Sequence, residues 1–370
     1  MRLPRLKPPP DHPFAYYHCI SRVVDRDFKF GPADKDRFVA LMEEYAQFCG
    51  VRIVTYCIMC NHFHILVEVP KPPENLTGHD WLFERLDVLT VSYPIAGSVR
   101  QQISKFIEQD AQDLVQKVVE KYKALMWNLS AFMKLLKQRF SRLFNRKHDR
   151  KGTLWESRFQ GTLVEGAGNA LLAVAAYIDL NPVRAGMVTD PSEYRWSGYS
   201  KACRGDAKAV ESVRFVVATA QNVEKEKVTA EVAMLEYRKY LIGKSAMDPV
   251  NADTGGVDTP SATTNQSQDD ASRVPSQPSP GRVPLGPTKS EILEKVLEKK
   301  RVSLSEFVQI RVRCFTDGVV LGSKKFVEEI FQHHREKFGP KRKQGGTRVR
   351  GLDKDENLYT LRNLQKRPFG

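Results

Sequence analysis

The segment Asn61-His62-Phe63-His64-Ile65-Leu66-Val67 is the most informative stretch of the chain. Its run of apolar residues predicts a β-strand, and alternate residues of a strand face the same side. His62 and His64 therefore project together, while Phe63 and Ile65 face the opposite side. Two neighbouring imidazoles can form half of a divalent-metal site, so the segment is a candidate for metal binding.

Other interpretations of the histidine pair are open at this point. Cys57 and Cys60 precede the pair, so a zinc cluster of sulfur and nitrogen ligands is one alternative, although cysteine is often only a small buried hydrophobic residue. A histidine-triad hydrolase needs a third histidine at the next alternate position, which is Leu66, so that class is excluded. The plain structural alternative is two strand histidines held by unrelated hydrogen bonds.

A candidate nucleophile lies far along the chain. Tyr177 and Asn181 are four residues apart in a predicted helix, so their side chains share one face. A hydroxyl and an amide oxygen presented together could complete a site that already holds two histidines. The alternative is that Tyr177 packs in the core while Asn181 caps the end of the helix.

The composition limits the class of partner. The chain has 370 residues, a net charge of +14 and a pI near 9.4, which favours a polyanion such as nucleic acid. No apolar run is long enough for a membrane helix, and the N-terminus MRLPRLKPPPDHPF lacks the apolar core of a signal peptide. The six scattered cysteines are typical of reduced thiols, so we expect a cytoplasmic protein without a membrane partner.

Hydrophobic periodicity predicts a mixture of strands and helices. Strands are expected over 16–24, 52–59, 63–69 and 159–164, and helices over 34–48, 99–125, 129–144 and 169–181. Near the C-terminus, helices are expected over 290–300, 303–313 and 323–334.

Several of these segments together resemble a known family. They are YHCISR (17–22), Arg26, Phe30, Asp36 and Phe38, NHFHILVEV (61–69), LWESRFQ (154–160) and YIDLNPVRAG (177–186). These segments, in this order, closely resemble the single-tyrosine HUH transposases (IS200-like), specifically the REP-associated tyrosine transposase branch. The resemblance covers residues 13–200, with 74–125 as an insertion.

The resemblance implies both a fold and a reaction. The fold would be α+β, a ferredoxin-like antiparallel sheet with helices on one face. His62 and His64 match the metal ligands of the family, Asn181 matches a third ligand, and Tyr177 matches the nucleophile. The cofactor would be Mg²⁺ or Mn²⁺, and the product of nicking would be a covalent 5′-phosphotyrosine that allows strand transfer. The sequence names no dedicated general base.

The implied substrate is single-stranded DNA next to a hairpin, of the kind formed by REP-like imperfect palindromes. The basic residues that we expect near phosphates are Arg22, Arg26, Lys134, Lys137, Arg139, Arg142 and Arg158. His18 is not assigned as a ligand. Whether the protein acts as a monomer or as a homodimer stays open.

We expect the following organisation of the chain. Residues 1–200 would form the catalytic domain, 201–244 a helical extension, 245–288 a disordered linker, and 289–370 a small, basic, mainly helical module. The module would be either an extra DNA-binding unit or a packing element. The rival to the enzyme is a catalytically silent protein that binds DNA hairpins.

Overall fold

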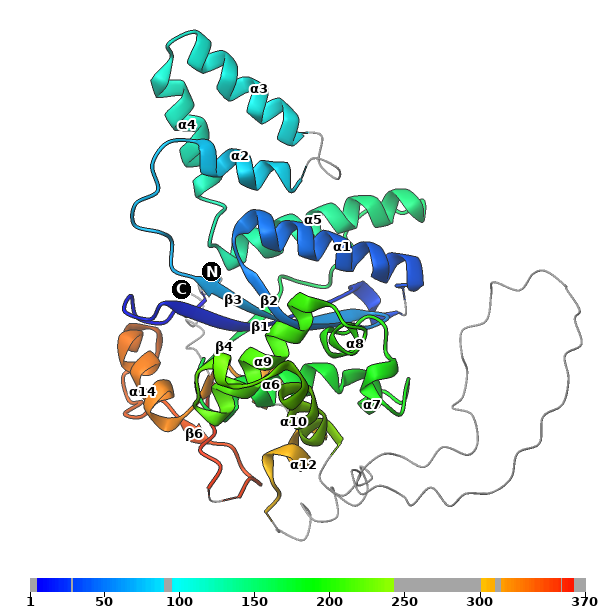
Figure 1. The fold of residues 1–370 in the computed structure, drawn as a ribbon. Helices are drawn as coiled ribbons and strands as arrows, with labels where there is room; N and C mark the ends of the chain where they lie inside the picture. The colour runs from blue at the N-terminus through cyan, green and yellow to red at the C-terminus, as the bar shows by residue number, and fades with distance from the viewer. Residues whose placement is uncertain are drawn as a thin grey trace, which may run out of the picture.

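The computed structural model describes residues 5–27, 29–89, 95–242, 301–309, 314–353 and 355–362. The predicted linker and the predicted helix over 290–300 lie outside these residues. Figure 1 shows a central sheet between two layers of helices, with a group of three helices projecting from one layer. None of the helices that the structure describes is long and apolar enough to cross a lipid bilayer.

Seven strands form one sheet in the order β2-β3-β1-β4-β5-β7-β6. Their bounds are β1 Phe14–Arg22, β2 Arg52–Ile58, β3 His62–Pro70, β4 Gln160–Val164, β5 Val320–Gly322, β6 Thr347–Arg348 and β7 Tyr359–Leu361. Every pairing is antiparallel except that of β4 with β5. The expectation of an entirely antiparallel sheet is therefore wrong at this one pairing.

The helices lie on both faces of the sheet rather than on one. On one face are α1 Pro32–Cys49 and α5 Leu129–Lys147, with α2 Asp80–Asp87, α3 Ile95–Glu108 and α4 Gln112–Lys123 beyond them. On the other face are α6 Asn169–Asp179, α7 Asn181–Arg184, α8 Gly198–Cys203, α9 Ala207–Gln221, α10 Ala230–Ile242 and α12 Leu304–Gln309.

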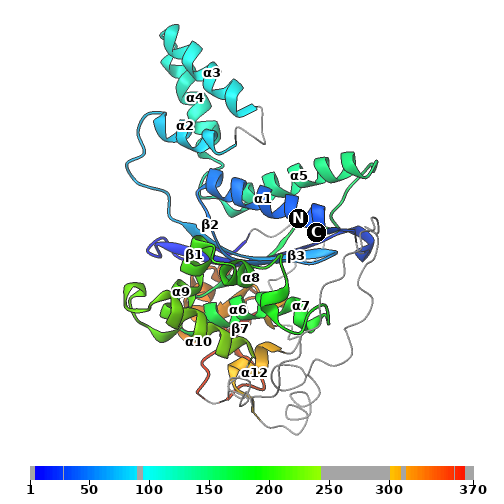
Figure 2. The ribbon, with the colours of Figure 1, turned by 45° about the vertical axis from the view of Figure 1, so that its right-hand side comes forward.

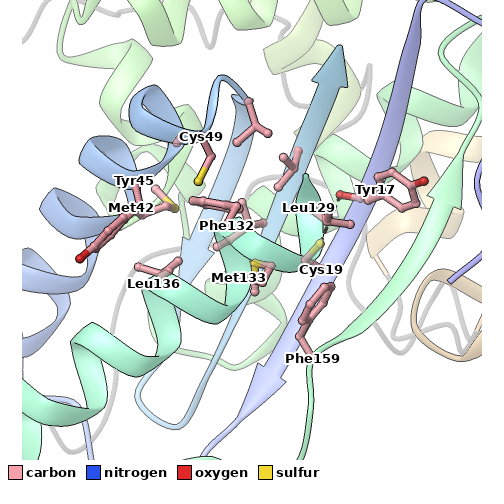
Figure 3. Close-up of a cluster of buried hydrophobic side chains, with 14 of the residues drawn as sticks. Tyr17, Cys19, Met42, Tyr45, Cys49, Leu129, Phe132, Met133, Leu136 and Phe159 are labelled. Atoms are coloured by element: carbon pink, nitrogen blue, oxygen red, sulfur yellow. Dashed lines mark hydrogen bonds between the residues drawn. The ribbon is translucent and has the colours of Figure 1, made fainter. Parts of the chain in front are cut away.

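The physical reason for this correction is that both faces of the central strands are apolar. Phe63 and Ile65 of β3 pack in the cluster formed with α1 and α5, whereas Leu66 packs in the cluster formed with α6. Figure 3 shows the first cluster, in which Tyr17 and Cys19 of β1 lie beneath the helices. A sheet with two buried faces needs helices on each side.

Local signals set the ends of the helices that cover the first face. Helix α1 starts at Pro32 and ends at Cys49, and the φ of 66° at the next residue, Gly50, suits a residue without a side chain. A Cβ at Gly50 would lie 3.0 Å from Nε1 of Trp127, so space as well as conformation favours glycine. Helix α5 begins after Asn128, whose side chain accepts hydrogen bonds from the amides of Ser130 and Ala131.

The C-terminal residues extend the main sheet, which the prediction of a mainly helical module did not include. β5 pairs with β4, and α13 Cys314–Asp317 and α14 Lys324–His333 flank β5 along the chain. The carboxylate of Glu165, next to β4, accepts hydrogen bonds from the amide and the hydroxyl of Ser323, at 2.6 and 2.8 Å. Ser323 caps α14, so one carboxylate joins β4 to that helix.

Replacing Glu165 with alanine tests whether this connection stabilises the fold. We expect the free energy of unfolding to fall by about 2 kcal/mol, because two hydrogen bonds to a charged group are lost. Chemical denaturation followed by circular dichroism measures the change. Glu224→Ala is the matched control, because its ion pair with Lys227 is exposed and should contribute under about 1 kcal/mol. Equal stability of the two variants would contradict the assigned role of Glu165.

Candidate active site

The two histidines of β3 lie on the face of the sheet that α6 covers. The ring centroids of His62 and His64 are 5.1 Å apart, and the His64 ring centroid is 6.0 Å from that of Tyr177 on α6. The opposite side of the strand is filled by Phe63, whose ring lies 4.9 Å from that of Phe38. The alternation expected from the sequence therefore places both imidazoles on one face of the strand, with the ring of His64 next to the candidate nucleophile.

A third histidine, His18 of β1, completes the cluster. Its Nδ1 lies 2.8 Å from the carbonyl oxygen of Phe315, and its Nε2 lies 2.9 Å from Nδ1 of His64. In the β1–β3 register His18 stands opposite Leu66, so His18 and His64 are diagonal neighbours across the two strands.

These contacts determine which ring nitrogens carry hydrogen. A carbonyl oxygen only accepts, so Nδ1 of His18 donates to Phe315 and its Nε2 is left as an acceptor. Nδ1 of His64 must then donate to His18, which leaves the lone pair of His64 on Nε2. Nδ1 of His62 lies 2.7 Å from Oδ1 of Asn61, an acceptor, so the lone pair of His62 is on Nε2 as well.

Burial keeps the two inner histidines neutral. His18 and His64 are almost completely enclosed. Burial lowers the pKa of His18 to about 4, against a smaller opposing effect of the hydrogen bond to Phe315. Burial, followed by the neighbouring His18 and His62 rings, holds the pKa of His64 well below its ordinary value. Metal ions bind the neutral imidazole, so the donor set fits a divalent cation.

Tyr177 is enclosed by rings and by one cation. Its ring stacks on Phe315 with centroids 4.7 Å apart, and His18 lies edge-on at 6.1 Å. The guanidinium of Arg184 lies 4.1 Å from the ring centroid and also donates to the carbonyl oxygen of Tyr177. Tyr177 is only 2% exposed, so Phe315 from the C-terminal part of the chain covers the candidate nucleophile.

Asn181 lies just beyond α6, which ends at Asp179 rather than at residue 181. Its Nδ2 donates to the carbonyl oxygens of Tyr177 and Ile178, each at 3.1 Å. Asn181 therefore caps the C-terminal end of α6, which is the alternative role considered from the sequence. Its Oδ1 accepts no hydrogen bond within the described part of the chain, so the oxygen that a metal would need is not engaged there by the protein.

The two cysteines upstream of the histidines do not assemble a zinc site with them. The thiol of Cys57 donates to Met59, and the sulfur of Cys60 accepts from the ammonium of Lys35 at 3.3 Å. Burial raises the pKa of Cys57 well above its ordinary value, which disfavours the thiolate that zinc requires. Among the described residues, no cluster of three metal-ligating side chains includes either cysteine.

Four of the predicted DNA-contacting residues lie around one cleft on the opposite face of the sheet. These are Lys134, Lys137, Arg142 and Arg158. Arg139 does not line that cleft. Arg22 ends β1 directly opposite His62 in the register. The side chain of Arg26 lies outside the described part.

The sequence prediction missed His18, Arg184 and Phe315. His18 carried a recognisable signal, because it occupies an alternate position of a strand adjacent to the histidine strand. Its contact with His64 depends on the register of the two strands, which the residue pattern does not give. The contact of Phe315 with Tyr177 joins residues on either side of the undescribed stretch, and no local pattern signals it.

One comparison with known proteins matches a family model over a short part of the chain. Residues 13–75 match the model of a family described as "Transposase IS200 like", a stretch that includes His18, His62 and His64 and ends before Tyr177. The chain is also similar to a solved structure described as the REP-associated tyrosine transposase bound to a REP hairpin. The identity is 11% and the TM-score 0.33, over 52% of this chain and 80% of that chain. No curated protein matches the sequence.

Removing the His18 ring tests whether it orients His64 toward a metal. We expect His18→Phe to weaken Mn²⁺ binding by roughly 10- to 100-fold, the usual effect of losing a partner that orients a ligating histidine. His18→Gln should restore part of the affinity, because its amide oxygen can accept from His64. Isothermal titration calorimetry with Mn²⁺ provides the readout, with His79→Ala in the helical projection as control. Mn²⁺ binding by His18→Phe as tight as that of the unsubstituted protein would show that His18 is only a packing residue.

Proposed function

We propose that this chain, whose residues 13–75 belong to the IS200-like transposase family, nicks and rejoins single-stranded DNA through Tyr177. The observation that carries the proposal is the geometry of the cluster. His62 and His64 both present an Nε2 lone pair, and the ring of Tyr177 lies beside His64. A tyrosine beside imidazoles that can ligate a metal ion suits nucleophilic cleavage of a phosphodiester.

The histidine pair would hold the metal. His62 and His64 would bind Mg²⁺ or Mn²⁺ through Nε2, and Oδ1 of Asn181 is the candidate third ligand. When bound, such an ion supplies charge stabilisation on a non-bridging phosphate oxygen. His18 and Asn61 would fix the rings in the tautomers that ligation requires, through the hydrogen bonds described above.

The covalent step exchanges one bond to phosphorus for another and moves one proton, using only groups of the protein and the DNA. The hydroxyl oxygen of Tyr177 forms a bond to phosphorus while the bond from phosphorus to the 3′-oxygen breaks. The phenolic proton is transferred, directly or through water, to the departing oxygen, which becomes a 3′-hydroxyl. The guanidinium of Arg184 over the ring favours the negative charge that develops on the phenolic oxygen. Attack by another 3′-hydroxyl on the phosphotyrosine reverses the step and joins new ends.

The substrate would be single-stranded DNA beside a hairpin. The positive net charge of the chain supports a nucleic-acid partner. The rival proposal, hairpin binding without turnover, is favoured by one observation, the burial of Tyr177 beneath Phe315. The two proposals differ in whether a covalent intermediate ever forms.

A Tyr177→Phe variant tests the nucleophile directly. With Mn²⁺ and labelled oligonucleotides that carry a hairpin, the unsubstituted protein should form an adduct that survives denaturing electrophoresis. The Tyr177→Phe variant should form none, because it lacks the attacking oxygen, while its DNA affinity should stay within about twofold. Tyr194→Phe, another buried tyrosine outside the cluster, is the control for loss of a hydroxyl. An adduct formed by Tyr177→Phe would show that the nucleophile is elsewhere.

Removing the ring of Phe315, which stacks on Tyr177, distinguishes an enzyme from a protein that binds hairpins without turnover. DNA can reach the hydroxyl only if the covering side chains move, so Phe315→Ala should speed adduct formation at least severalfold. A quench-flow time course of the denaturant-resistant adduct measures the rate. Phe307→Ala, which removes a neighbouring buried ring, controls for general loosening of the segment. Tight hairpin binding by Phe315→Ala with no adduct on any oligonucleotide would favour the silent DNA-binding protein.

A further inference from the structure

A second group of metal-ligating side chains lies far from Tyr177. A ring nitrogen of His12 and one carboxylate oxygen each of Asp11 and Glu329 lie within 4.8 Å of one another. His12 precedes β1, whereas His62 stands opposite the last residue of β1, so the two groups are about 25 Å apart along the strand. Figures 1 and 2 show the start of β1 at the far end of the sheet from α7, the helix that follows α6.

The three side chains come from distant parts of the sequence. Glu329 is on α14, and its Oε1 lies 2.9 Å from Nε2 of His12, a residue 317 positions earlier. The His12 ring also lies edge-on to Phe326, one turn earlier on α14, with ring centroids 6.0 Å apart. Asp11 is exposed and makes no hydrogen bond or ion pair within the described residues, so its carboxylate is available to a ligand.

The backbone that carries the two N-terminal groups is held in place by the protein itself. The segment 7–13 reads KPPPDHP, and each proline fixes its own φ angle, so little conformational freedom is lost when the side chains are ordered. The amide of Lys71 donates to the carbonyl oxygen of Pro13 at 2.9 Å. At the other end of the segment, the ring of His334 contacts the backbone of Lys7. The segment is therefore attached both to the sheet and to the end of α14.

The donor set suits zinc better than magnesium or manganese. Zn²⁺ binds imidazole nitrogen and carboxylate oxygen at about 2.0–2.2 Å, so two ligand atoms of a zinc tetrahedron lie roughly 3.4 Å apart. The 2.9 Å between Nε2 of His12 and Oε1 of Glu329 needs to widen by only about 0.5 Å to reach that spacing. Mg²⁺ prefers oxygen ligands throughout, and Mn²⁺ binds a given set of nitrogen and oxygen ligands more weakly than Zn²⁺ does.

The group faces open space that can hold the rest of a coordination shell. His12 and Glu329 line a cavity of about 310 Å³ between the start of β1 and α14, so water can supply a fourth ligand. The chain carries a net charge of +14, yet neither Asp11 nor Glu329 forms an ion pair with a lysine or arginine within the described part. Two carboxylates without such a partner attract a divalent cation.

We propose that Asp11, His12 and Glu329 bind Zn²⁺, and that the ion joins the segment before β1 to α14. The site shares no residue with the histidine cluster and does not depend on the function proposed above. The ligands come together only in the folded protein, so the free energy of zinc binding stabilises the packing of α14 against the start of β1.

Zinc binding by a His62→Ala variant tests the site, because this substitution removes a half-exposed ligand of the other group. After treatment with EDTA and dialysis, the variant should bind one Zn²⁺ ion per chain, as measured by competition with a chromophoric chelator. In this background His12→Ala should weaken zinc binding more than roughly 100-fold, since even residues that only orient a ligand contribute about 10- to 100-fold. Asp11→Asn should weaken it roughly tenfold or more.

Asp11→Asn also separates zinc binding from folding. Asp11 is exposed and lacks a protein partner in the described part, so Asp11→Asn should leave the Tm without zinc unchanged. Zn²⁺ should raise the Tm of His62→Ala, and less so that of His62→Ala/Asp11→Asn, since an ion stabilises the state that binds it. His79→Ala is the matched control, because His79 pairs with Asp80 at the surface and no third ligating side chain joins them among the described residues.

Three results would overturn the proposal. They are the absence of bound Zn²⁺ in His62→Ala, an unchanged zinc affinity after both Asp11→Asn and His12→Ala, and an equal loss of affinity in the His79→Ala control. If His12→Ala does not fold, Glu329→Gln replaces it, because the amide keeps the size of the side chain and removes its charge. Glu329→Gln should then weaken zinc binding as Asp11→Asn does, and an unchanged affinity in both would again overturn the proposal.

Discussion

The pairing of β1 with β3 is the constraint on which the rest of the structure depends. The register places Cys19 opposite Ile65 and Ile20 opposite His64, and it sorts every side chain of the two strands onto one face or the other. Because the side-chain period of a strand is two, a slip of one residue would move Phe63 toward α6 and drive His64 into the apolar cluster under α1. Both faces of the sheet are buried, so moving Phe63 or His64 to the wrong face would destabilise the folded state.

The same register turns three isolated histidines into a connected group. His18, His64 and the carbonyl oxygen of Phe315 form a line of donors and acceptors in which only one arrangement of hydrogens satisfies every partner. In a buried site an unsatisfied polar group is expensive, so this arrangement stabilises the fold while it orients the ring that faces Tyr177. Packing and chemistry are therefore served by the same contacts.

Strong local patterns made much of the central fold predictable. The alternation around His62 and the apolar face of α1 gave the right elements, because each is long and clearly periodic. The helices on both faces were missed, because the expectation of one covered face came from the resemblance rather than from the residues of β1 and β3 themselves. The strands β5, β6 and β7 were missed because two or three residues carry no periodicity, and their pairing depends on distant partners. At the site, residue type and spacing were enough to predict His62 and Tyr177. The contacts of Phe315 and Arg184 with Tyr177 are visible only in the three-dimensional structure.

The pairing of β4 with β5 has a consequence for the order in which the molecule assembles. The hydroxyl of Thr162 donates to the carbonyl oxygen of Gly318, a contact that spans 156 residues, and the acceptor for His18 lies in the same late segment. During synthesis, β1, β3 and α6 can pack together long before residue 315 leaves the ribosome, because domains begin to fold from the N-terminal side. The contact between Thr162 and Gly318 closes a much longer loop, which is slow. The nascent chain would therefore pass through a stage in which Tyr177 has its histidine neighbours but not its aromatic cover.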